Sequence, residues 1–223
     1  MGIRLLAVTA VACGALAAPA AAQVTVSPLK PCYVSAGRTK EARENVQIAA
    51  TGFTPGGRVE ILLDGVLAAT AAADTMGNFA GAIDAPFQAS GEAAFSVHVR
   101  DQSDPMGLSA TLMSRVTDLD ARMRPRRADA SDRVRLKGRG FTRDAPIFAH
   151  YVFDGVRQKR VRLARGPTAP CGTFTARRRQ IPIADPGIGE WTIQIDQRRR
   201  YSPRPRPVWV QIPVTVRAEF KAP

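Results

Sequence analysis

The amino-acid sequence predicts an all-β protein built as two tandem antiparallel sandwiches. The first observation is an internal repeat, because four short motifs of the first half return in the same order in the second half. The pairs are Gly52-Phe53-Thr54 with Gly140-Phe141-Thr142, Asp64-Gly65 with Asp154-Gly155, Gly77-Asn78-Phe79 with Gly172-Thr173-Phe174, and Gly91-Glu92 with Gly189-Glu190. Their offsets of 88, 90, 95 and 98 residues grow steadily, as expected of a duplicated unit that gained loop residues. A period of about 95 residues is too long for a solenoid repeat and fits two small domains.

The second observation is the alternation of apolar and polar residues. Val59-Glu60-Ile61, Phe95-Ser96-Val97 and Ile193-Gln194-Ile195 place apolar side chains on one face of an extended chain, the pattern of a half-buried strand. Glycine and proline separate such runs at intervals of about 8 to 14 residues. The Asp-Gly pairs at 64–65 and 154–155 lie between apolar runs, where a two-residue hairpin turn requires positive φ.

These signals give seven expected strands in each repeat. In the first repeat they lie near residues 24–28, 45–51, 57–63, 66–73, 78–84, 93–100 and 108–117. In the second they lie near residues 119–125, 132–139, 146–153, 157–165, 173–180, 190–197 and 207–217. Seven antiparallel strands in about 95 residues is the strand count of an immunoglobulin-like sandwich, in which two sheets enclose one core. We therefore expect two such domains, over residues 23–117 and 118–223.

The first repeat contains a distinctive set of turn and strand residues: Gly52 to Val59, Asp64-Gly65, Asp74, Gly77 and Phe79. These residues resemble the bacterial extracellular immunoglobulin-like repeats of secreted actinobacterial proteins. The mature chain, including Pro31 to Gly37 and Pro170 to Phe174, is similar to uncharacterised exported proteins of soil actinobacteria. The resemblance implies this fold and export, and it carries over no catalytic or ligand residue.

The amino terminus reads as a secretory signal peptide over residues 1–22. Arg4 precedes an apolar stretch from Leu5 to Leu16, and Ala20-Ala21-Ala22 offers a small-residue cleavage site. A membrane anchor would need about 20 apolar residues, and this stretch is interrupted at Pro19. No second apolar span follows, so we expect no transmembrane segment in the mature chain and place it outside the cell or on the cell envelope.

Two cysteines remain after cleavage, Cys32 and Cys171, one in each repeat. In the seven-strand topology Cys32 follows the first strand at the carboxyl end of its domain. Cys171 aligns with Met76 of the first repeat, and this alignment places Cys171 in a turn at the amino end of the second domain. Because these ends meet in a tandem array, we predict a disulfide between the domains. The alternative is two separate thiols with Cα atoms more than about 7 Å apart.

The two repeats differ strongly in charge. Residues 23–117 contain seven lysines and arginines against nine acidic residues, a net charge of −2, whereas residues 118–223 contain 24 against ten, a net charge of +14. Most of these cations are arginines, which suit bidentate contact with phosphate, sulfate or carboxylate. A GC-rich genome would also enrich arginine, although the first repeat contains only five.

Strand alternation directs many of these cations outward. If the first, second, fourth and fifth strands of the second repeat form one sheet, nine cations share its outer face. They are Arg122, Arg124, Arg133, Arg135, Lys137, Arg139, Arg160, Arg162 and Arg177. One interpretation is a docking surface for an extended polyanion or an anionic membrane surface. The other is a solvated face whose charges keep sheets from pairing at their edges.

Catalytic and cofactor signals are weak. His98 and His150 both lie inside expected strands, and the sequence has no nucleophile elbow, metal-binding motif or glycine-rich phosphate loop. We therefore predict no enzymatic activity, no catalytic residue, no metal and no cofactor. Specific nucleic-acid recognition is not expected, because no aromatic residues interleave with the cations to stack bases.

Three functions remain open at this point. The first is an exported binding module whose basic second domain docks on an anionic cell-envelope polymer. The second is an accessory protein that engages an unidentified protein partner through the Arg-Pro segment near Tyr201. The third is a small-molecule carrier of immunoglobulin-like fold, which would require an apolar cleft.

Overall fold

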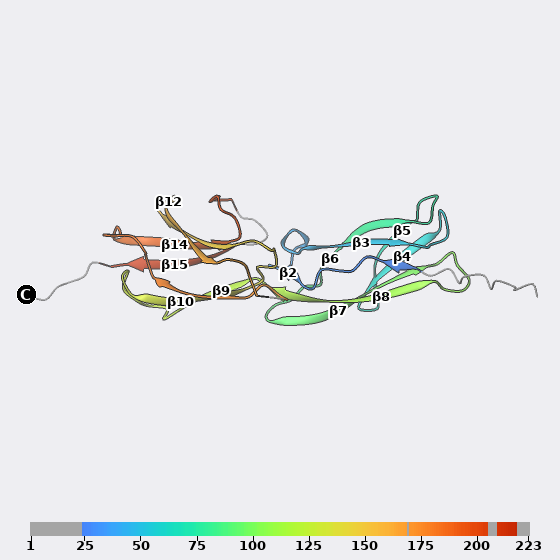
Figure 1. Ribbon diagram of the computed structural model, residues 1–223, viewed down its shortest axis with the longest axis horizontal. Helices are drawn as coiled ribbons and strands as arrows, with labels where there is room; N and C mark the ends of the chain where they lie inside the picture. The colour runs from blue at the N-terminus through green and yellow to red at the C-terminus, as the bar shows by residue number, and fades with distance from the viewer. Residues whose placement is uncertain (1–23, 169, 205–208, 218–223) are drawn as a thin grey trace, which may run out of the picture.

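The computed structural model describes residues 24–168, 170–204 and 209–217. Within them the chain forms fifteen β-strands and one short 3-10 turn, η1 (Lys40–Ala42), so the prediction of an all-β fold is confirmed. The molecule is elongated, with its two halves arranged end to end (Figure 1). We call residues 24–118 the first sandwich and residues 119–217 the second sandwich. The expected signal peptide, residues 1–22, lies outside the described residues.

The first sandwich contains two sheets, which both use strands from distant parts of its sequence. Its strands are β1 (Thr25–Val26), β2 (Tyr33–Ser35), β3 (Asn45–Thr51), β4 (Arg58–Leu63), β5 (Val66–Ala72), β6 (Phe79–Asp84), β7 (Glu92–Asp101) and β8 (Ser109–Asp118). One sheet has the order β1-β3-β6 and the other the order β2-β8-β7-β4-β5. All pairs are antiparallel except β2 with β8, which is parallel.

The second sandwich repeats this plan without a counterpart of β2. Its strands are β9 (Asp120–Arg124), β10 (Arg133–Arg139), β11 (Ile147–Phe153), β12 (Val156–Ala164), β13 (Phe174–Arg179), β14 (Gly189–Asp196) and β15 (Trp209–Val216). One sheet has the order β13-β10-β9 and the other the order β12-β11-β14-β15. Every pair is antiparallel.

Each pair of sheets encloses its own apolar core. In β10, Val134 and Leu136 are buried while Arg133, Arg135 and Lys137 are exposed, which is the period-two pattern expected of a strand with one wet face. Across the core, β14 contributes Trp191, Ile193 and Ile195, all buried, as β7 does with Phe95, Val97 and Val99 in the first sandwich. Burial of these side chains from water supplies the main stabilising free energy.

The repeated Gly-Phe-Thr and Gly-x-Phe motifs contact each other in each sandwich. Phe53 donates its backbone N–H to the carbonyl of Gly77 at 3.1 Å, and Phe141 donates to Gly172 at the same distance. The rings of Phe53 and Phe79 then meet edge to face, with centroids 6.4 Å apart, and the corresponding rings of the second sandwich, Phe141 and Phe174, lie 5.2 Å apart. The Gly-Phe-Thr and Gly-x-Phe motifs therefore recur because they close the amino end of each core.

Substituting Gly77 by alanine is expected to destabilise the fold far more than the same change at Gly65. Both glycines have positive φ, +76° and +81°, which costs an L-residue about 1–2 kcal/mol. A Cβ at Gly77 would also lie 2.3 Å from the Phe53 carbonyl oxygen, whereas a Cβ at Gly65 has no atom within 4 Å. Urea denaturation of Gly77→Ala and Gly65→Ala measures the difference, and equal losses of stability would contradict this packing.

Tyr151 provides a pH-dependent test of the second core. Burial raises the pKa of the Tyr151 phenol from 10.0 to about 12, although the nearby positive charge of Arg178 acts in the opposite direction. The folded protein thus holds this proton more tightly than the unfolded chain. The stability that the neutral phenol contributes is complete below pH 10 and is lost as the pH rises through about 12.

We expect Tyr151→Phe to reduce the alkaline loss of stability. At neutral pH it should leave stability unchanged or raise it by about 1 kcal/mol, because the Tyr151 hydroxyl has no hydrogen-bond partner among the described residues. Denaturation midpoints between pH 8 and about 12, measured for both proteins, test this. An alkaline decline of the same steepness in the variant would contradict it.

The observed strands coincide with the expected ones except at β2. This strand has only three residues, and its parallel pairing with β8 matches Tyr33 to Val116 and Ser35 to Asp118. All three residues are buried, so the segment shows no alternation. It fills the open edge of β8 at the end of the first sandwich that faces the second (Figure 1).

One sheet assignment was wrong. The fourth strand of the second repeat, β12, was expected beside the first, second and fifth strands, but it pairs with β11 in the opposite sheet. The reason is the two-residue turn at Asp154 and Gly155, with φ of 48° and 73°. A hairpin this tight obliges the strands on either side to be antiparallel neighbours in one sheet.

The two sandwiches are joined covalently at their junction. Cys32, just before β2, forms a disulfide with Cys171, in the turn before β13, and their Cα atoms are 5.1 Å apart. Both residues are buried. The predicted bridge between the halves is therefore confirmed. Leu119 is the only residue between β8 and β9, so the sandwiches are also linked by almost continuous strand.

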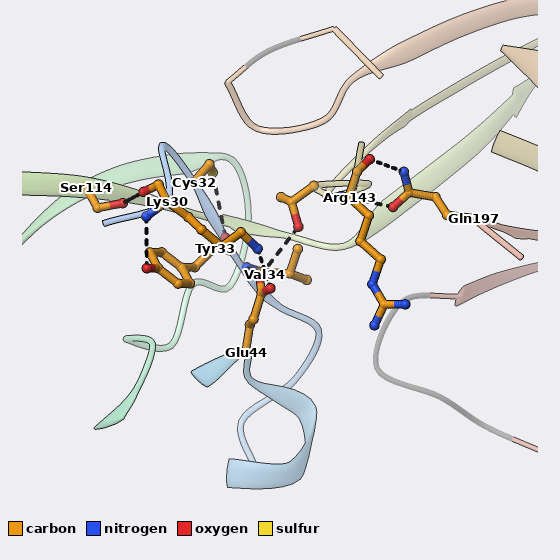
Figure 2. A network of polar contacts seen from close by, with 9 residues as sticks. Lys30, Cys32, Tyr33, Val34, Glu44, Ser114, Arg143 and Gln197 are labelled. Carbon is orange, nitrogen blue, oxygen red and sulfur yellow. Dashed lines mark hydrogen bonds and ion pairs between the residues drawn. The ribbon is translucent and has the colours of Figure 1, made fainter. Parts of the chain in front are cut away.

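A network of polar contacts lies near Cys32 at the junction (Figure 2). Glu44 accepts the backbone N–H of Val34 at 3.1 Å and a hydrogen bond from the Thr142 hydroxyl of the second sandwich at 3.5 Å. In the second sandwich, Gln197 accepts the N–H of Arg143 and donates to its carbonyl, at 3.2 and 2.6 Å. These contacts satisfy backbone groups of the loops that meet at the junction.

Candidate anion-binding surface

The outer face of the β9-β10-β13 sheet is the candidate site, and we call it the cationic face. Alternation places Ala121, Val134 and Ala176 in the core, and the neighbouring residues therefore point outward. Seven of the nine predicted cations belong to these strands: Arg122, Arg124, Arg133, Arg135, Lys137, Arg139 and Arg177. All are exposed except Arg139, which is half-buried. Arg179, which the sequence places in a basic cluster with Arg177 and Arg178 at the loops and edges, is also exposed and is two positions beyond Arg177 on β13.

Strand register aligns these cations in rows across the sheet. Arg135 is paired with Arg124 on one side and with Arg177 on the other, so three arginines lie in one row. In neighbouring rows, Lys137 is paired with Arg122, and Arg133 with Arg179. Directly opposed like charges destabilise a sheet, by roughly 0.2–1 kcal/mol for a pair. The arrangement therefore has an energetic cost in the free protein that a bound anion would offset.

Two of the seven cations have acidic partners. Arg122 Nε lies 2.7 Å from Asp120 Oδ2, and Arg139 Nη2 donates to Asp118 Oδ2 at 2.8 Å. The hydrogen bond to Asp118 raises the pKa of the Arg139 guanidinium, despite partial burial. Asp118 also accepts the N–H of Gly91 at 3.0 Å, so Arg139 helps to hold the junction together. We therefore assign Arg139 a structural contact rather than a position free to bind a ligand.

The other cations of this face have no ion-pair partner in the described part of the chain. They are Arg124, Arg133, Arg135, Lys137 and Arg177. All seven predicted residues of this face line one open hollow of about 910 Å³. The strands themselves border this hollow. A hydrogen-bonded sheet, rather than a loop, therefore carries its charges.

Arg160 and Arg162 do not belong to the cationic face. Both lie on β12, where they are paired with His150 and Phe148 of β11 in the opposite sheet. The Arg160 guanidinium is 5.4 Å from the centre of the Phe148 ring on the outer side of that sheet. The prediction of nine cations on one face is thus wrong. The tight hairpin at 154–155 was the sequence signal that would have corrected it.

The described residues contain no group of three or more histidine, cysteine or acidic side chains placed to hold a metal ion. Their one histidine–carboxylate contact joins His150 Nε2 to Asp196 Oδ1 at 3.3 Å, and both side chains are buried. Among the same residues, no helix has the length and apolar character needed to span a bilayer.

No family model and no curated protein matches this chain. Among solved structures, it is similar to the β-glucuronidase of Parabacteroides merdae, with a TM-score of 0.30 and 8% identity over 86% of this chain and 25% of that one. β-Glucuronidase 3 of Bacteroides uniformis gives a TM-score of 0.31 and 10% identity, covering 87% of this chain and 25% of that one. The chain thus spans about a quarter of the length of these enzymes.

A 1.5-MDa bacterial ice-binding adhesin is also similar. Its TM-score is 0.29 and its identity 12%, over 87% of this chain and 65% of that one. The BSP domain of a biofilm-associated protein is similar with a TM-score of 0.26 and 15% identity, over 89% of this chain and 30% of that one. TM-scores near 0.3 carry no argument about ligand or activity, so the functional argument rests on the residues of the chain itself.

Proposed function

We propose that this chain is an exported, non-catalytic binding module whose second sandwich docks on an anionic polymer of the cell envelope. The observation that carries the proposal is the row Arg124, Arg135 and Arg177, three exposed arginines opposed across three strands. A row of like charges is an unfavourable arrangement that a chain of anions would relieve. The proposal includes an immunoglobulin-like assignment for both sandwiches and the likeness to exported actinobacterial proteins.

The form of the surface favours an extended ligand. Its cations occupy several rows along paired strands, which are spaced by about 4.8 Å across a sheet and about 6.8 Å between alternate residues of one strand. A single small anion would contact one or two of these cations, whereas a polymer with repeated charges reaches several at once. The planar guanidinium groups suit bidentate contact with carboxylate, sulfate or phosphate.

The chemistry of the face also favours a particular class of polymer. Its outward positions are arginine, lysine, threonine and Asp120, and none is aromatic. Bases of a single-stranded nucleic acid would therefore find no stacking partner on this sheet. Acidic polysaccharides and phosphate-bearing wall polymers require only the charges, so we propose this class as the ligand.

Chromatography on immobilised heparin tests the proposal, with uncharged dextran as the control matrix. We expect the mature protein to bind heparin at low salt, to pass through dextran, and to elute from heparin with rising sodium chloride, because counterion release makes such binding salt-dependent. Passage through heparin at low salt would contradict the proposed function. Retention that salt does not reverse would indicate that the protein binds heparin through contacts other than charge attraction.

A further inference from the structure

A second cluster of arginines lies on the opposite side of the second sandwich. Residues 198–204 follow β14 and include Arg198, Arg199, Arg200 and Arg204, all exposed. We call this segment the arginine loop. It contacts side chains on the outer side of β11 and β14, the sheet that does not carry the cationic face.

Buried polar side chains hold the backbone of this loop. His150 Nε2 donates to the carbonyl of Arg198 at 3.0 Å, and Asp196 Oδ1 accepts the N–H of the same residue at 2.8 Å. Gln194 Nε2 donates to Asp196 Oδ2 at 2.9 Å and to the carbonyl of Ser202 at 3.3 Å. The exposed fractions of His150, Gln194 and Asp196 are only 0%, 2% and 5%.

The strand beside the loop adds to this arrangement. Arg160 Nη1 donates to the carbonyl of Arg199 at 2.7 Å while its guanidinium lies against the Phe148 ring. The Tyr201 ring centre is 6.0 Å from that of His150. The loop backbone is thus fixed at Arg198, Arg199 and Ser202, whereas the side chains of Arg198, Arg199 and Arg200 extend into solvent.

A merely solvated loop would not need such support. Burial of histidine, glutamine and aspartate on a sheet costs free energy that apolar residues would not cost, unless their polar atoms are well paired. Here His150 Nε2 and Gln194 Nε2 donate to loop carbonyls and Asp196 Oδ1 accepts a loop N–H, whereas His150 Nδ1 and Gln194 Oε1 have no hydrogen-bond partner among the described residues. Fixing the backbone lowers the ordering cost of binding for the arginines that it presents.

We infer that the arginine loop, with Arg160 and Arg162 of β12, forms a second anion-binding surface, and that one molecule therefore bridges two polyanion chains. This inference rests on the proposed function. The two surfaces lie on the outer sides of two sheets packed face to face, so they face away from each other. One polymer chain lying along the cationic face leaves the loop free to bind another.

A two-chain capture assay tests the inference. Beads coated with heparin are loaded with the mature protein and washed, and fluorescently labelled soluble heparin is then added at the same low salt. Three triple variants are compared with the wild type: R124Q/R135Q/R177Q on the cationic face, R198Q/R199Q/R200Q in the loop, and R126Q/R127Q/R217Q as a charge-matched control elsewhere on the second sandwich. All nine substituted side chains are exposed, so each variant should fold.

The wild type and the control variant are expected to load onto the beads and capture labelled heparin. The loop variant should load but capture no more label than protein-free beads. Capture by the loop variant equal to that of the wild type overturns the bridging inference while leaving the proposed function intact, as does loading of the wild type without capture. Failure of the wild type to load overturns both.

Discussion

Replacing Cys32 and Cys171 together by alanine is expected to lower the free energy of unfolding by about 5 kcal/mol. The bridge closes a loop with a sequence separation of 139 residues, and in the chain-entropy account such a loop restricts the unfolded chain by about that amount. Both sulfur atoms are buried at the junction, so their loss also removes contacts between the sandwiches. Few single features of this chain should contribute as much.

Guanidinium denaturation of the oxidised wild type and of the double variant measures this effect. Without the bridge, we expect an earlier midpoint and separate transitions for the two sandwiches, since each has its own core. The contacts of Arg139 with Asp118 and of Thr142 with Glu44, together with the linking residue Leu119, would then remain between the sandwiches. Coincident curves for the two proteins would show that the bridge does not stabilise the junction.

The triple variant R124Q/R135Q/R177Q is expected to lose affinity for heparin and to gain stability. Removing three cations should reduce the slope of log K against log salt by up to about 3, which corresponds to an affinity loss of roughly 10- to 1000-fold at moderate salt. The same change removes two directly opposed like-charge pairs, Arg135 with Arg124 and Arg135 with Arg177. Stability should therefore rise by about 1 kcal/mol.

Opposite changes in affinity and stability distinguish a binding surface from a solvated one. The variant R126Q/R127Q/R217Q removes the same charge from exposed positions that the strand register does not place in these rows. It should weaken binding only slightly. If both triple variants reduced the affinity equally, net charge alone would explain the binding, and the rows would have no special role.

The repeat predicted most strand positions because its motifs have local causes. The Asp-Gly hairpins, the turn glycines Gly77 and Gly172 and the alternation within strands are properties of neighbouring residues, and so they can be read from the sequence. The Cys32–Cys171 bridge joins distant residues, and it was predictable because the repeat placed each cysteine at the end of its sandwich that faces the other.

The features that sequence reasoning missed depend on distant partners. Strand β2 is three residues long, and its position depends on the open edge of β8, which lies more than 70 residues later, and on contacts with Arg43 and Glu44. The arginine loop has the sequence of a charged, proline-containing segment. Its own residues do not indicate that His150 and Gln194 hold its backbone. His150 was treated as an ordinary strand histidine, whereas the fold buries it completely.

Residue-resolved protection of arginines is the most direct test of the cationic face. The protein without its expected signal peptide, residues 23–223, is modified with an arginine-specific dicarbonyl reagent, with and without heparin, and each site is quantified by mass spectrometry. We predict the strongest protection at Arg124, Arg135 and Arg177, with the arginine loop as the second protected region and little change at Arg126, Arg127 and Arg217. Equal protection of all exposed arginines, or none in the row, would contradict the assignment of this sheet as a polyanion-binding surface.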